Sequence, residues 1–138
     1  METMTPGMLD RVHVLVVDED PVARARVRNI VVHEGGIVSP ASTAGRVLDF
    51  VTVVRPSVIV CDLRLGGGRR GVWLIDQLSS GRLGSVPVIA TSAVAEDGAL
   101  AATLPVSGFV AKPVDAEDLC ALILGAVESR SLRRTVLR

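Results

Sequence analysis

The chain has 138 residues, with 15 basic and 15 acidic side chains and no formal net charge. This length fits one domain with a single hydrophobic core, and neither the balanced charge nor an aromatic content of 2% favours nucleic-acid binding. No apolar run is long enough for a signal peptide or a membrane span, and Cys61 and Cys120 lack a metal-binding spacing. We therefore expect a cytoplasmic domain with buried thiols and no membrane association.

The first half of the chain predicts three strands separated by two helices. Apolar runs rich in β-branched residues predict strands at residues 12–17, 37–41 and 58–62. Pro21 suits the first position of a helix that Asp20 caps. Pro40 cannot donate a backbone hydrogen bond, so the second strand is expected at an edge of the sheet. Residues 1–10 lack periodicity and predict a flexible leader.

The second half continues the alternation and completes five strands and five helices. It predicts helices at residues 72–80 and 95–104, strands at 87–92 and 108–111, and a last helix capped by Asp115. Residues 11–127 form the predicted domain, and residues 128–138 a basic C-terminal tail. Regular alternation with short connections implies right-handed crossovers. We expect an α/β fold of the flavodoxin-like (βα)5 type, a three-layer sandwich around a parallel sheet in the order 2-1-3-4-5.

Polar residues follow four of the predicted strands at the point where each strand ends. They are Asp18 and Glu19, Asp62, Thr91 and Ser92, and Lys112. Because the carboxyl ends of parallel strands share one edge of the sheet, these side chains are expected to converge. Three carboxylates brought together repel one another unless a cation joins them, and oxygen ligands with room for water suit Mg²⁺. The sequence therefore predicts a magnesium site at this edge.

Four segments together resemble a known family. They are VLVVDEDP, VIVCDLRL, PVIATSA and GFVAKP, in this order along the chain. The chain resembles the response-regulator receiver domain (CheY-like) of bacterial two-component signalling over about residues 11–127. Each segment alone is a weak signal, because an apolar strand that ends in an acid is common, but the four in order form a strong one.

The resemblance implies a role for each strand-end residue. Asp62 would accept a phosphoryl group, which Ser92 and Lys112 would bind. Ser92 and Phe109 would act as the switch residues that respond to phosphorylation. The implied Mg²⁺ ligands are the side chains of Glu19 and Asp62, Asp18 through water, and the backbone carbonyl of Arg64.

The function implied is that of a stand-alone phosphoacceptor switch rather than an enzyme. A sensor histidine kinase or phosphotransfer protein would phosphorylate Asp62, and the product would dock on a downstream effector protein. One alternative is a pseudo-receiver that interacts independently of phosphorylation. A second is a haloacid-dehalogenase-like phosphatase, with Asp18 as nucleophile and Asp20 as general acid.

The last predicted helix carries apolar residues beyond those that one core-facing stripe needs. Cys120, Leu124 and Val127 form this second stripe. We therefore take homodimerisation or partner docking through the last helix as a hypothesis.

Overall fold

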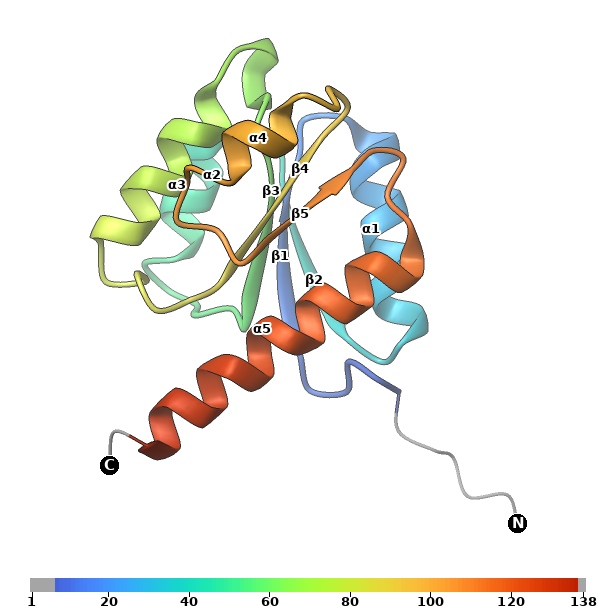
Figure 1. The fold of residues 1–138 in the computed structure, drawn as a ribbon, viewed down its shortest axis with the longest axis vertical. Helices are drawn as coiled ribbons and strands as arrows, with labels where there is room; N and C mark the ends of the chain where they lie inside the picture. The colour runs from blue at the N-terminus through green and yellow to red at the C-terminus, as the bar shows by residue number, and fades with distance from the viewer. Residues whose placement is uncertain (1–6, 137–138) are drawn as a thin grey trace.

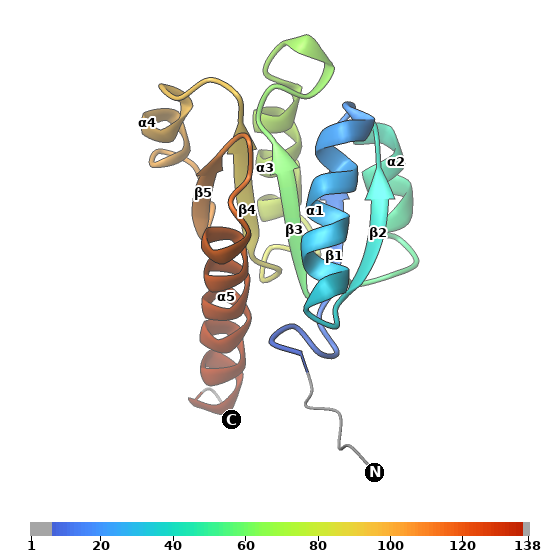
Figure 2. The ribbon, with the colours of Figure 1, turned by 90° about the vertical axis from the view of Figure 1, so that its right-hand side faces the viewer.

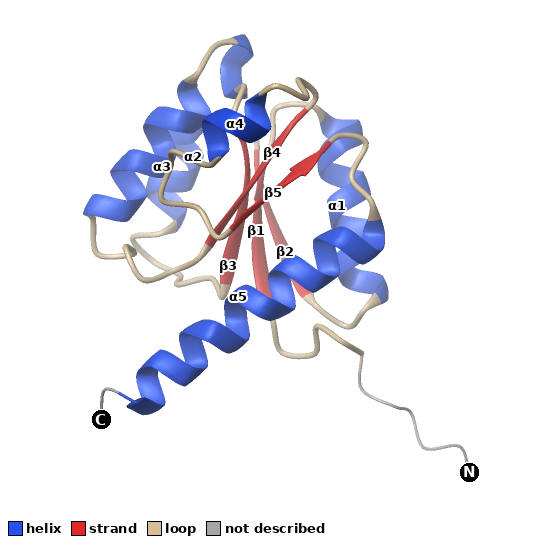
Figure 3. Ribbon diagram, viewed as in Figure 1, coloured by secondary structure: helices blue, strands red, loops and turns tan. Residues whose placement is uncertain are grey.

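The computed structural model describes residues 7–136, with side chains described for residues 7–130. Strands and helices alternate along this part of the chain (Figures 1 and 3). The strands are β1 (His13–Val17), β2 (Ile37–Ala41), β3 (Val58–Asp62), β4 (Val88–Ser92) and β5 (Gly108–Ala111). The helices are α1 (Pro21–His33), α2 (Ala44–Phe50), α3 (Arg70–Ser80), α4 (Asp97–Ala101) and α5 (Ala116–Val136), with a 3-10 turn at Leu65–Gly67.

The five strands form one parallel sheet in the order β2-β1-β3-β4-β5, which confirms the predicted topology. Pro40 pairs in register with Val16 on the edge strand β2, where its missing donor breaks no central ladder. Helices α1 and α5 cover one face of the sheet, and α2 and α3 cover the other (Figures 1 and 2). The short helix α4 lies beside β5. The molecule is therefore the expected three-layer sandwich.

Strand β3 is the centre of this sheet and is buried along its whole length, as the unbroken apolar run Val58–Cys61 predicted. Ile59 and Cys61 belong to the core beneath α2 and α3, whereas Val58 and Val60 belong to the core beneath α1 and α5. Packing on both faces holds the backbone of β3 in place. The acid that ends this strand, Asp62, is therefore carried on a rigid support.

The segment before β1 packs more closely than the predicted leader. Leu9 is fully buried in the core beneath α1 and α5, and its backbone N–H donates to the carbonyl of Glu34 at 2.9 Å. The boundary that the sequence suggested after residue 10 thus falls inside a packed turn. Residues 1–6 of the predicted leader lie outside the described residues.

The last helix continues well beyond the expected end of the domain, because α5 runs to Val136. Of the three residues in the predicted second stripe, Cys120 is buried in the core and Val127 packs against the same cluster, whereas Leu124 is half-buried and belongs to neither core cluster. The prediction of a surface stripe is therefore wrong for Cys120, which packs within the domain. Homodimerisation through this helix remains a hypothesis. No described helix is long and apolar enough to cross a membrane.

Candidate functional site

Asp62 lies at the carboxyl end of β3 and is 6% exposed. Its Oδ1 accepts a hydrogen bond from the backbone N–H of Arg64 at 3.0 Å, which orients the carboxylate. Helix α3 approaches closely from behind. A Cβ on Gly71 would lie 1.9 Å from the carbonyl oxygen of Asp62, so only glycine permits this approach. The hydrogen bond from Arg64 therefore orients the carboxylate of Asp62, and the close approach of α3 packs against the backbone that carries it.

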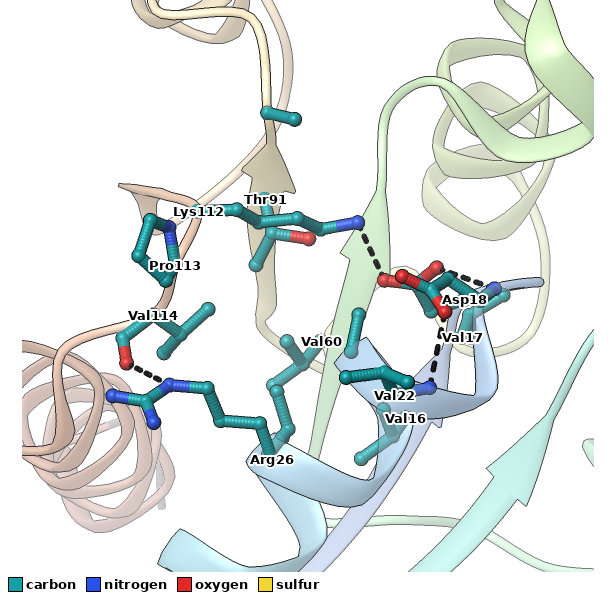
Figure 4. Close-up of a pocket in the computed structure, with 14 residues that line it drawn as sticks. Val16, Val17, Asp18, Val22, Arg26, Val60, Thr91, Lys112, Pro113 and Val114 are labelled. Atoms are coloured by element: carbon teal, nitrogen blue, oxygen red, sulfur yellow. Dashed lines mark hydrogen bonds and ion pairs between the residues drawn. The ribbon is translucent and has the colours of Figure 1, made fainter.

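Lys112 joins two of the strand-end carboxylates. Its Nζ lies 2.6 Å from Oδ2 of Asp18 and 3.3 Å from Oδ2 of Asp62. Figure 4 shows the lysine reaching across from the end of β5 toward Asp18. The second oxygen of Asp18 accepts from the backbone N–H of Asp20 at 3.0 Å. Side chains from three of the four predicted strand ends thus form one charged cluster, in which the two carboxylates are buried and the lysine is partly exposed.

This cluster also controls the protonation of the lysine. Burial alone would lower the pKa of Lys112, but hydrogen bonds and charge from Asp18 and Asp62 outweigh it and raise that pKa above its usual value. Lys112 is therefore a cation at neutral pH. Two buried carboxylates face a single ammonium, so the three side chains together carry a net negative charge when both acids are ionised.

The predicted third carboxylate does not join this cluster. Glu19 is exposed, and no three acidic, histidine or cysteine side chains among the described residues lie close enough to hold a metal ion. The backbone carbonyl of Arg64 accepts the N–H of Gly67 at 3.0 Å and keeps one lone pair. The oxygen donors of Asp18 and Asp62 and their excess negative charge nevertheless fit a hard divalent cation.

Ser92, the predicted hydroxyl, is fully buried at the end of β4 and belongs to a second network. Its Oγ donates to Oδ2 of Asp97 at 2.7 Å and accepts from the backbone N–H of Val94 at 3.0 Å. Arg64 binds the same carboxylate with two hydrogen bonds of 2.8 Å. These bonds, from Arg64 first and then Ser92, lower the pKa of Asp97 to about 2.

Phe109, the predicted aromatic switch, lies on β5 and is half-buried against the core beneath α2 and α3. A Cβ on Gly98 would lie 3.5 Å from its ring, so the ring packs next to α4. Phe109 and Ser92 are in neighbouring strands and offset by two residues in register, since Ser92 pairs with Ala111. The structure thus brings both predicted switch residues to the β4–β5 side of the site.

The family assignment follows from comparison with known proteins. The family described as the response regulator receiver domain matches residues 14–124, most of the chain. The chain belongs to this receiver-domain family. Receiver domains act as phosphoacceptor switches, generally bind Mg²⁺ at their acidic phosphorylation site, and interact with histidine kinases and effectors. The alternative of a haloacid-dehalogenase-like phosphatase with Asp18 as nucleophile is therefore not supported.

Relatives of the receiver domain include both short and long chains. A 14.6 kDa protein from the sodA1 3′ region of Leptolyngbya boryana is 30% identical over 119 residues, which is 83% of this chain and 89% of the relative. NtrX from Brucella abortus is 28% identical with a TM-score of 0.83. The match covers 93% of this chain but only 30% of the NtrX chain. A CheY-like receiver domain from Methanospirillum hungatei is 21% identical with a TM-score of 0.79 and shares the fold, over 90% of this chain and 99% of its own.

Sequence reasoning missed Asp97 and the side chain of Arg64. Asp97 looked like part of a poor helix, although it is only 3% exposed in the structure. A carboxylate five residues after the strand-end Ser92 was the available signal. This spacing alone does not predict the contact between Asp97 and Ser92, because that contact depends on how the loop between β4 and α4 folds.

Proposed function

We propose that Asp62 accepts a phosphoryl group from a phosphorylated histidine and that the domain then signals by docking on an effector protein. The observation that carries this proposal is the position of Lys112, whose ammonium lies between the buried carboxylates of Asp18 and Asp62. A cation in this position stabilises negative charge that develops on a phosphoryl group at Asp62. Family membership supports the same chemistry.

The transfer is a displacement at phosphorus. A bond forms between a carboxylate oxygen of Asp62 and phosphorus, while the phosphorus–nitrogen bond of the donor imidazole breaks and the imidazole takes up a proton. Lys112 would pair with a phosphoryl oxygen, and Ser92 would donate a hydrogen bond to another. The backbone N–H of Arg64 keeps Asp62 in the attacking orientation through its 3.0 Å hydrogen bond.

We assign the divalent cation to Asp18 and Asp62, with Glu19 and the backbone carbonyl of Arg64 as further ligands. When bound, Mg²⁺ supplies positive charge that neutralises the acids and the incoming phosphoryl oxygens. Glu19 is exposed beside Asp18, so its side chain is free to turn toward the ion. Asp20 instead caps α1, because its Oδ1 accepts a hydrogen bond from the backbone N–H of Val22 at 3.0 Å.

An apolar surface beside the acceptor supports a protein as the phosphodonor. A cavity of about 340 Å³ opens between α1 and the loop after β5, lined largely by apolar residues that include Val60, Ala23 and Val114 (Figure 4). Val22, at the start of α1, leaves 75% of its surface exposed next to this cavity. We infer that a helix of a sensor kinase or phosphotransfer protein covers this surface while its histidine reaches Asp62.

Phosphorylation with a small donor tests the proposal. Incubation with Mg²⁺ and acetyl phosphate is expected to add one phosphoryl group to the wild-type chain in intact-mass measurements. Asp62→Asn is expected to abolish the addition. Asp76→Asn, an exposed acid on α3, serves as the matched control and should label like wild type. Labelling that survives in Asp62→Asn would refute the assignment of the acceptor.

The pseudo-receiver remains the second candidate, and the exposed position of Glu19 is the observation that favours it. A domain whose third acid never reaches the metal would bind Mg²⁺ weakly and label poorly. Absence of both Mg²⁺ binding and labelling in the wild-type chain would decide for a phosphorylation-independent interaction module.

A further inference from the structure

Asp97 accepts three hydrogen bonds from two residues that lie beside the proposed phosphorylation site, Ser92 and Arg64. Its Oδ2 accepts from Ser92 at 2.7 Å and from Nε of Arg64 at 2.8 Å, and its Oδ1 accepts from Nη2 of Arg64 at 2.8 Å. The donors come from two different elements, the end of β4 and the loop after β3. A buried carboxylate, 3% exposed, therefore ties the end of β4 to the loop after β3.

The hydroxyl of Ser92 cannot serve Asp97 and a phosphoryl group at the same time. A serine hydroxyl has one hydrogen, and in this structure that hydrogen is directed at Asp97. The oxygen of Ser92 is also held from the other side by the N–H of Val94 at 3.0 Å. A phosphoryl group on Asp62 would need the same hydrogen, so it must displace the carboxylate.

Arg64, like Ser92, binds Asp97 through donors that could bind a phosphoryl group instead. Arg64 lies two residues after Asp62 in the chain, and its backbone N–H binds the Asp62 carboxylate. Its side chain therefore begins close to the acceptor. Its guanidinium meets Asp97 through two parallel hydrogen bonds, the geometry in which arginine also binds phosphate. The side chain is 37% exposed, which leaves it room to turn. A phosphoryl group therefore offers this guanidinium a second anion of suitable shape.

We propose that Asp97 is a positioning residue that acts as a built-in competitor of the phosphoryl group, holding Ser92 and Arg64 until the anion on Asp62 draws them away. This inference rests on the proposed function. It adds that the unphosphorylated state is stabilised by Asp97, so that occupancy of the site by a phosphoryl group costs the release of its hydrogen bonds. Removal of the carboxylate should then favour the phosphorylated state.

Binding of beryllofluoride, a non-covalent mimic of the phosphoryl group, tests the inference. Titration of the full chain in the presence of Mg²⁺, followed by ¹⁹F NMR, gives the affinity. Asp97→Asn and Asp97→Ala are each expected to bind about tenfold more tightly than wild type, because a charge-assisted hydrogen bond no longer competes. Asp97→Asn keeps the shape of the side chain and guards against a loss of folding in Asp97→Ala.

A double-mutant cycle with Ser92→Ala identifies the route. The gain from Asp97→Ala should shrink in the Ser92→Ala background, a result that a merely structural role for Asp97 would not produce. Glu96→Gln, an exposed acid beside Asp97, is the control for charge and should leave the affinity unchanged.

The outcomes separate this inference from the function on which it rests. If wild type binds beryllofluoride and the Asp97 variants bind it equally or less tightly, the competitor role is refuted while the phosphoacceptor role stands. If wild type does not bind beryllofluoride at all, both are refuted.

Discussion

The ammonium of Lys112 lies 2.6 Å from a carboxylate oxygen of Asp18, closer than its 3.3 Å distance from Asp62. Lys112 is thus anchored mainly on the acid that follows β1, and the acceptor carboxylate is the more weakly held of the two. This asymmetry leaves Asp62 able to exchange its contact with the lysine for a bond to phosphorus. It also makes the two acids experimentally distinguishable.

Metal binding should depend on Asp18 and not on its neighbour Asp20. Asp18→Asn removes one of the two buried carboxylates and, with it, the excess negative charge of the cluster, and we expect the affinity for Mg²⁺ to fall by about tenfold or more. Asp20→Asn is the matched control, because asparagine caps a helix as well as aspartate does and Asp20 is exposed. Isothermal titration with MgCl₂ measures both. Equal losses in the two variants would contradict the assignment of the ligands.

Lys112 is the only lysine in the sequence, which makes its reactivity directly measurable. Only the uncharged amine reacts with acylating reagents, so its raised pKa should slow acylation at a given alkaline pH in metal-free buffer. Asp18→Asn removes the carboxylate that raises the pKa most, and acylation of Lys112 should become several-fold faster, since one pKa unit changes the free amine about tenfold.

Peptide mass spectrometry follows the acylation of Lys112 over time. Asp76→Asn, on the exposed surface of α3, is the control, and Lys112 of this variant should be acylated at the wild-type rate. The difference between Asp18→Asn and wild type should disappear as the pH rises above the pKa of the native lysine. A rate in Asp18→Asn equal to wild type at every pH would show that Asp18 does not control the lysine.

The approach of α3 to Asp62 should make Gly71 irreplaceable. A Cβ in Gly71→Ala would overlap the carbonyl oxygen of Asp62 at 1.9 Å, so α3 must shift, and we expect destabilisation of about 3 kcal/mol. The same substitution at Gly125, on α5, meets no atom within 4 Å and should stabilise by about 0.5–1 kcal/mol. Urea unfolding gives both values. Equal effects of the two substitutions would contradict the close packing.

Burial of Leu9 predicts that the segment before β1 contributes to stability. Leu9→Ala removes a fully buried side chain and should lower the free energy of unfolding by about 2–5 kcal/mol. Its neighbour Met8 is 51% exposed, so Met8→Ala is the control and should cost much less. If thermal or urea unfolding shows the same small loss for both, the segment does not pack in solution as the structure shows.

Much of the fold was predictable because its signals are local. An unbroken apolar run such as Val58–Cys61 indicates a strand buried on both faces, and Pro40 indicates an edge strand. Leu9 escaped prediction because a single apolar residue in an aperiodic segment carries no period. Its burial depends on the turn at Glu34, which lies after α1.

The sequence by itself determined which chemical groups reach the edge of the sheet, since Asp18, Asp62 and Lys112 each follow a strand and parallel strands end on one side. Only the tertiary structure decided which partner each group takes. The loop between β4 and α4 turns Asp97 onto Ser92 and Arg64, while Glu19 faces solvent. Strand ends follow from periodicity along the chain, whereas the pairing of donors with acceptors follows from loop geometry and from competition between anions for the same hydrogen atoms.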